Sequence, residues 1–180
     1  MEPILGILAL ILIIFIAHQI DTVNKKRKDD NLRKQSKNAT LYIKLPVFQG
    51  LPVAEGTLCE ISSCPNYYEF NANNVSFKLD KDKVQDICIK TDTEIKKHYT
   101  SSVGGAIGGA VLFGPIGAMI GGRAKEKKTT SKKNYLIFTY TKDDSIKYIS
   151  FDCTNSITAI KFVNEFTKNN KITTNTTIEL

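Results

Sequence analysis

The feature that most constrains how this chain can fold is an uncharged, glycine-rich run in its middle, Val103–Gly122 (VGGAIGGAVLFGPIGAMIGG). Its glycines recur four residues apart, and on a helix this spacing gives smooth faces that another backbone can approach closely. The glycines that form these faces are Gly104, Gly105, Gly108, Gly109, Gly117 and Gly121. Apolar arms of this kind need burial, so the run predicts packing against other helices or entry into a membrane.

The run lies between segments with strand-like patterns. A single crossing of a membrane would place the strands of one sheet on opposite sides, so a single crossing is excluded for a one-domain chain. Pro115 lies near the centre of the run among glycines and favours a turn there. We therefore expect a hairpin of two short helices within residues 101–124, which dips into one leaflet, packs against an N-terminal helix or self-associates. A flexible glycine-rich loop and a hairpin packed on its own domain are the alternatives.

Basic residues border the glycine run on both sides. The chain has a net charge of +7, and Lys96–Lys133 alone carries eight basic side chains against the single acidic Glu126. Basic residues that bracket an apolar hairpin suit contact with anionic lipid head groups. The residues expected to make this contact are Lys96, Lys97, Arg123, Lys125, Lys127 and Lys128. No nucleic-acid partner is expected, because such proteins spread basic residues over a face with aromatic residues between them.

A second apolar run, Ile4–Ala17, opens the chain without a polar side chain. Extended to Ile20, it would form a helix of about 27 Å, just enough to span a bilayer. The sequence therefore predicts a transmembrane anchor over residues 1–22. A cleaved signal peptide and a buried helix are the alternatives. The signal peptide is disfavoured because no positive charge precedes the run and no small-x-small cleavage site follows it.

Basic residues follow this predicted anchor, over residues 23–39. By the positive-inside rule they keep the rest of the chain in the cytoplasm, which predicts a single-pass protein of the cell membrane with a cytoplasmic C-terminal domain. The same residues are interpreted as a solvated basic linker, and contact with anionic lipid is the alternative.

Residues 40–169 are long enough for one domain with a core, and their periodicity is mostly that of strands. Apolar residues alternate with polar ones in Val75–Leu79, and a turn at Asn71–Asn74 joins this strand to the one before it. The predicted strands cover Thr57–Ser62, Tyr67–Phe70, Val75–Leu79, Val84–Thr91, Tyr135–Tyr140 and Ile146–Phe151. Helical spacing follows in Ala159–Phe166, and residues 170–180 are interpreted as a disordered tail. The predicted fold class is α+β.

The order of the strands, the glycine run between two middle strands and the closing helix together resemble bacterial pleckstrin-homology-like (PH-like), GRAM-like domains. The residues that carry the resemblance are GLPVAEGTLCEIS (Gly50–Ser62), VSFKLDKDKVQDICI (Val75–Ile89), the glycine run and AIKFVNEF (Ala159–Phe166). The resemblance covers the last three quarters of the chain. It implies a partly open β-barrel capped by the C-terminal helix, and proximity to a membrane more than any activity.

Groups that could perform catalysis or bind a metal are sparse. The chain has two histidines, His18 beside the apolar run and His98, and the four cysteines (Cys59, Cys64, Cys88 and Cys153) lack paired C-x-x-C spacing. The glycine run lacks the G-K-[ST] ending of a phosphate-binding loop. We therefore expect neither an enzyme, a cofactor nor a metal site. Cys59 and Cys64 could pair only if the domain were exported.

These observations give three functional hypotheses. The first is a membrane-tethered, non-enzymatic binding module that acts at the cytoplasmic face of the membrane, with anionic lipid as partner. The second is an assembly protein whose glycine faces drive homo-oligomerisation or binding to another membrane protein. The third and weakest is catalysis through Cys64 or Cys153.

Overall fold

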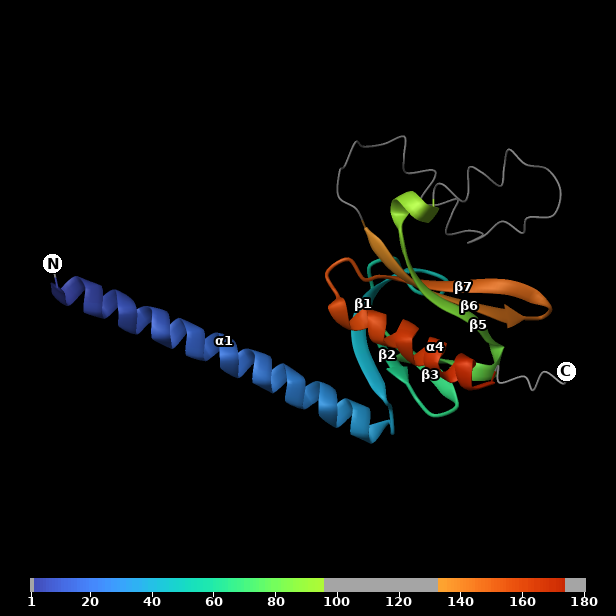
Figure 1. The fold of residues 1–180 in the computed structure, drawn as a ribbon, viewed down its shortest axis with the longest axis horizontal. Helices are drawn as coiled ribbons and strands as arrows, with labels where there is room; N and C mark the ends of the chain where they lie inside the picture. The colour runs from blue at the N-terminus through green and yellow to red at the C-terminus, as the bar shows by residue number, and fades with distance from the viewer. Residues whose placement is uncertain (1, 96–132, 174–180) are drawn as a thin grey trace, which may run out of the picture.

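The computed structural model describes residues 2–95 and 133–173, with side chains from residue 10 to 95 and from 133 to 170. A long helix, α1, leads into a sheet domain that ends in a second helix, α4 (Figure 1). The described elements are α1 Glu2–Ser36, β1 Leu41–Gln49, β2 Leu58–Ser63, β3 Tyr67–Ala72, β4 Val75–Asp80, the 3-10 helix η1 Lys81–Lys83, β5 Val84–Thr91, β6 Asn134–Lys142, β7 Ser145–Asp152, the 3-10 helix η3 Ile157–Ala159, and α4 Ile160–Thr173.

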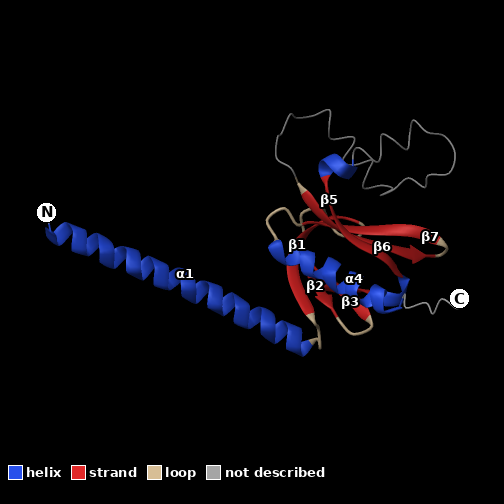
Figure 2. Ribbon diagram, in the orientation of Figure 1, coloured by secondary structure: helices blue, strands red, loops and turns tan. Residues whose placement is uncertain are grey.

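The described strands form one antiparallel sheet of seven strands in the order β4-β3-β2-β1-β7-β6-β5. β1 joins its two halves, because its residues 41–46 pair with β2 and Val47 and Gln49 pair with β7. The sheet is open among the described residues, with β4 at one end and β5 at the other. α4 lies across the sheet and contacts β5, as Figure 2 shows with helices in blue and strands in red. The architecture is α+β, as predicted.

The core is built from aromatic rings that several strands and α4 contribute. The centroid of the Phe138 ring lies 5.2 Å from those of Tyr68 and Phe70, 6.1 Å from that of Phe151 and 6.3 Å from that of Phe162. All five side chains are at most 1% exposed. Edge-to-face pairs such as Phe70 with Phe138 add to the free energy gained by burying their surface. This cluster holds the two halves of the sheet and α4 together.

Two tight hairpins turn at residues with positive φ, and the first confirms the turn predicted at Asn71–Asn74. Asn73 and Asn74 both have positive φ, at 52° and 62°, between β3 and β4. Asp143 and Asp144 do the same between β6 and β7, at 50° and 54°. Two-residue turns with positive φ match the twist of antiparallel strands, and Asn and Asp tolerate this conformation better than other non-glycine residues. The local sequence therefore fixes both hairpins.

The six predicted strands are confirmed, and the structure adds β1, which the sequence analysis missed. Pro46 within β1 lacks the N–H that a central strand normally donates, so the pattern did not suggest a strand. In the structure Pro46 is the last residue paired with β2, immediately before pairing with β7 begins. The predicted C-terminal helix is also confirmed and extends to Thr173, while the rest of the predicted tail lies outside the described residues.

A helix is confirmed at the N-terminus, and it continues to Ser36, well past the predicted boundary at residue 22. Among the residues that the structure describes, no helix is both long enough and apolar enough to cross a membrane. Within α1, the apolar turns are followed by a charged half that begins at Asp21.

Candidate functional site

The residues predicted to contact lipid head groups, and the glycines predicted to pack helices, all lie outside the described residues. The two ends of that segment are nevertheless placed. The Asp92 N–H donates a hydrogen bond of 3.0 Å to the Lys133 carbonyl, and β5 pairs with β6 along its length. Because the strands before and after the glycine run share one sheet, the condition that excludes a single membrane crossing is met.

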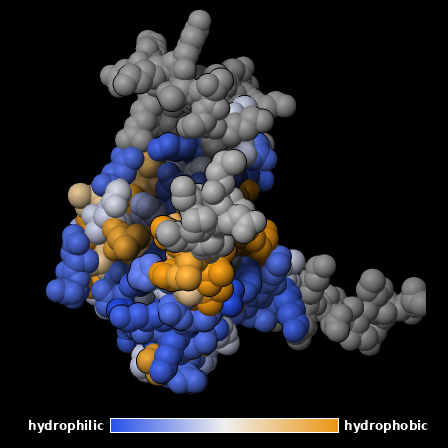
Figure 3. All heavy atoms as spheres, turned by 90° about the vertical axis from the view of Figure 1, so that its left-hand side faces the viewer, coloured by the Kyte–Doolittle hydropathy of each residue, from blue (hydrophilic) through white to orange (hydrophobic). Residues whose placement is uncertain are grey.

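The apolar turns of α1 form a continuous run of exposed hydrophobic residues. Seven consecutive residues are between 49% and 65% exposed: Leu10, Ile11, Leu12, Ile13, Ile14, Phe15 and Ile16. Figure 3 shows hydrophobic residues gathered where α1 points toward the reader, with hydrophilic residues around them. Because consecutive residues point in all directions around a helix, this surface surrounds α1 and no single flat face of a partner could cover it.

Ion pairs attach the other end of α1 to the sheet. Arg33 and Lys44 both pair with the Glu60 carboxylate, Lys44 at 2.9 Å. The Lys37 Nζ lies 2.8 Å from Glu69 Oε2, with both side chains mostly buried. The helix ends at Ser36, and the chain turns at Asn38, where φ is +50°. Oppositely charged side chains that are mostly buried are screened less by salt than exposed pairs. These ion pairs therefore hold the end of α1 against the sheet, at a defined joint.

Glu165 connects α4 to the start of β1 and to β2. Its carboxylate accepts hydrogen bonds from Ser63 Oγ and, at 2.6 Å, from Thr40 Oγ1, and the Lys81 Nζ lies 3.2 Å away. Burial alone would raise the pKa of Glu165, but these hydrogen bonds and the Lys81 charge outweigh it and lower the pKa. The Glu165 carboxylate therefore holds together elements that are distant in the sequence.

The described cysteines are unsuited to nucleophilic chemistry. All four are free, and Cys59, Cys64 and Cys153 are buried. Burial raises the pKa of Cys59 to about 12 and that of Cys153 to about 11, which leaves few thiolates at neutral pH. His98 lies outside the described residues, within which no cluster of three metal-ligating side chains occurs. Catalysis through Cys64 or Cys153 receives no support from this geometry.

A cavity of about 580 Å³ opens between β4 and the β6–β7 hairpin. Its floor is apolar, with Phe70, Phe77, Leu79 and Ile149, and lysines from three elements stand at its rim. Gly50 closes one end, where its φ of +99° turns the chain against β7. A Cβ at Gly50 would lie 2.0 Å from the Tyr148 carbonyl oxygen, so only glycine fits there. The sequence does not predict this cavity, because its walls come from strands far apart in the chain.

None of the three comparisons, with protein-family models, with curated proteins and with solved structures, gave a match. The resemblance to PH-like domains stays a prediction from sequence.

Proposed function

We propose that the protein is a non-enzymatic interaction module that the apolar turns of α1 tether to a membrane. The observation that carries this proposal is the exposure of Leu10–Ile16 on every side of the helix. Burying one large apolar side chain gains about 1.5–3 kcal/mol, so seven such residues favour strongly any surroundings that exclude water. Lipid chains surround a helix on all sides, whereas a protein partner covers one face of it.

The charges along α1 support placing the module at the cytoplasmic face. Directly after the apolar turns the helix carries Lys25, Lys26, Arg27 and Lys28. The cytoplasmic leaflet is rich in anionic lipid, and each basic residue near it contributes about 1 kcal/mol to binding. Insertion of the apolar turns with the basic turns at the surface satisfies both halves of the helix. The proposal requires insertion, and it does not require that α1 cross the bilayer.

The sheet domain then serves as the part that binds other molecules. Its open antiparallel sheet with a C-terminal helix supports a PH-like module, and its joint with α1 fixes how the domain is presented. The basic residues that border the glycine run, from Lys96 to Lys128, are proposed as a second contact with anionic head groups.

The tether is tested by flotation of the full chain with vesicles of phosphatidylglycerol and phosphatidylethanolamine. Ile13 is 65% exposed in the apolar turns, and Leu32 is 54% exposed in the charged half of the same helix. We expect Ile13→Lys together with Phe15→Lys to lower the bound fraction at least tenfold, because a charged side chain is costly in hydrocarbon. The matched control, Leu32→Lys, should bind as the unchanged chain does. Equal binding of all three chains would refute the tether.

A further inference from the structure

The cavity between β4 and the β6–β7 hairpin lies along the edges of two strands. Four consecutive residues of β4, Phe77–Asp80, line one wall, and four consecutive residues at the end of β6 and in its turn, Tyr140–Asp143, line the other. Successive side chains of a strand point to opposite faces of a sheet. A wall of four consecutive residues therefore includes the backbone edge of the strand, and we call this cavity the edge slot.

Both edges that border the edge slot lack a neighbouring strand among the described residues. β4 pairs with β3 through one edge and ends the sheet with the other. β5 pairs with β6 from Asn134 to Tyr140, so within the described strands Thr141 and Lys142 are paired with β7 alone. An unpaired strand edge presents N–H and C=O groups that serve as a template for an added strand.

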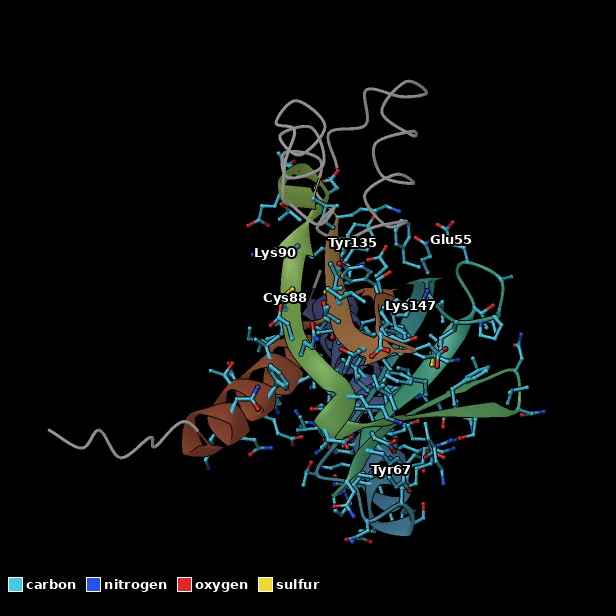
Figure 4. The ribbon with its side chains drawn as sticks, turned by 90° about the vertical axis from the view of Figure 1, so that its right-hand side faces the viewer. Glu55, Tyr67, Cys88, Lys90, Tyr135 and Lys147 are labelled. Atoms are coloured by element: carbon cyan, nitrogen blue, oxygen red, sulfur yellow. The ribbon has the colours of Figure 1, made fainter. Side chains whose placement is uncertain are left out.

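The edge slot is closed where β4 leads into β5. η1 joins the two strands directly, and its Lys83 lines the slot. α4 meets the chain at this closed end, where the Lys81 Nζ lies 3.2 Å from Glu165 Oε1. None of the described residues of α4 lines the slot, and Figure 4 shows the β3–β4 hairpin and α4 on opposite sides of β5. The slot therefore opens toward the turns of the two hairpins.

β4 carries apolar surface that the described part of the protein leaves uncovered. Val75, Phe77 and Leu79 lie on the same face of the strand, because they are two residues apart. Their exposure falls toward the closed end: Val75 is 49% exposed, Phe77 is partly exposed and Leu79 is 6% exposed. An edge strand with exposed apolar side chains is a site for pairing with another strand. The strand that covers this face needs an apolar residue at every second position.

The charges at the rim of the edge slot favour acidic residues at the alternate positions. Lys78 is exposed on the other face of β4, and Lys142 is exposed on the opposite wall, next to Asp143 in the turn. The Asp80 carboxylate already pairs with Lys83 at 2.9 Å. Opposite charges on neighbouring strands stabilise their pairing, and like charges destabilise it. An acidic side chain beside Lys78 therefore complements the charge that β4 leaves free.

We propose that the edge slot binds an extended segment of a partner protein, which adds to β4 as a strand and in which apolar residues alternate with acidic ones. The inference rests on the proposed role of the sheet domain as the part that binds other molecules. The backbone of the segment pairs with the edge of β4, its apolar residues cover Val75 and Phe77, and its acidic residues lie beside Lys78. A lipid chain would cover the apolar floor but leave the backbone groups of both edges unpaired, so the geometry favours a peptide.

The test is fluorescence anisotropy of a fluorescein-labelled peptide, IEIEIEI, mixed with the full chain in detergent micelles. A peptide of the same composition without alternation, IIEEEII, should bind at least fivefold more weakly. The same IEIEIEI peptide is also N-methylated, either on its glutamates or on its isoleucines. Because alternate N–H groups of a strand point to the same edge, one of these two sets forms the bonds to β4, and its methylation should weaken binding at least tenfold.

A charge exchange tests the position of the acidic residues. Lys78→Glu should weaken the binding of IEIEIEI and strengthen that of IKIKIKI, each at least fivefold, because the charge beside the added strand changes sign. The matched control is Lys161→Glu, which changes an exposed lysine of α4 that does not line the slot. This control should bind both peptides as the unchanged chain does. Improved binding of IKIKIKI also shows that the Lys78→Glu variant is folded.

Equal binding of IEIEIEI and IIEEEII, or binding that neither N-methylation weakens, would overturn strand addition. Binding that dodecyl phosphate abolishes and N-methylation leaves unchanged would assign the slot to an anionic amphiphile instead. The same preference between IEIEIEI and IKIKIKI in the unchanged chain and in Lys78→Glu would overturn the role of Lys78. The peptides are tested without vesicles, so loss of vesicle binding by the tether variants and loss of peptide binding are separate results.

Discussion

The sheet domain and the N-terminal half of α1 contain the same kinds of apolar side chain, which are buried in the domain and exposed on the helix. Ile61, Leu136 and Ile137 are completely buried in the domain, whereas Leu10–Ile16 are between 49% and 65% exposed in the helix. The domain can bury its apolar residues because strands distant in sequence fold over one another. A single helix cannot do this for residues on every side of it. The difference indicates that the domain buries its own apolar residues, while no described part of the chain covers the apolar turns of α1.

Removing one phenylalanine from each region tests most directly whether the two regions bury their apolar side chains differently. Phe138 contacts four other rings in the core, and Phe15 is 59% exposed on α1. Phe138→Ala should lower the free energy of unfolding of the domain by about 3–5 kcal/mol, because it leaves a cavity among rigid neighbours. Phe15→Ala should change it by less than about 0.5 kcal/mol. Urea unfolding followed by tyrosine fluorescence in detergent micelles measures both. A comparable loss from Phe15→Ala would mean that the apolar turns pack on the domain.

Two glycines of the β1–β2 connection should differ in how much their replacement by alanine lowers the free energy of unfolding. Gly50 and Gly56 both have positive φ, at 99° and 83°, but only Gly50 lies against another strand. Gly56→Ala should cost about 1 kcal/mol, from backbone strain alone. Gly50→Ala should cost about 2–4 kcal/mol, because a Cβ would also meet the Tyr148 carbonyl, as an overpacked site does. Urea midpoints measure the difference, and equal costs would show that the contact with β7 gives way without penalty.

The smallest expected effect concerns Glu165, which is polar and yet part of the domain. Its pKa is lowered in the folded protein, so its stabilisation is present above the unfolded value near 4.5 and is lost as the pH falls through the folded pKa. Glu165→Gln should cost about 1–2 kcal/mol at pH 7. The free energies of unfolding of the two proteins should converge as the pH falls from 4.5 through the lowered pKa of Glu165. A gap that stays constant from pH 7 to pH 3 would mean that the carboxylate charge plays no part.

Much of the fold could be predicted because local patterns report on it. The alternation in Val75–Leu79 and the turn residues after Tyr67–Phe70 were enough to define the β3–β4 hairpin, and helical spacing was enough for α4. β1 escaped because Pro46 argues against a strand, and only the change of partner from β2 to β7 explains how a proline is accommodated there. The apolar turns at the N-terminus were clear from the sequence, and the helix that contains them is confirmed.

The candidate binding surfaces divide in the same way. The apolar and basic halves of α1 follow from residue order alone, because neighbours in sequence are neighbours on a helix. The cavity between β4 and the β6–β7 hairpin could not be predicted from the sequence. Its floor combines Phe70 of β3, Phe77 and Leu79 of β4, and Ile149 of β7. A sequence pattern does not predict this combination of residues, because it depends on the order of the strands in the sheet.

Short-range interactions can be predicted from the residue order alone. They specify which segments form strands, where the hairpins turn, and that an apolar run precedes a basic one. Only the folded structure shows which strand edges are open among the described residues and which carboxylates form ion pairs or hydrogen bonds between elements. Glu60, Glu69 and Glu165 look like ordinary surface residues in the sequence, and the fold brings each of them to a lysine or an arginine. The reason is that pairing order and side-chain burial depend on contacts between distant residues, which local preference does not encode.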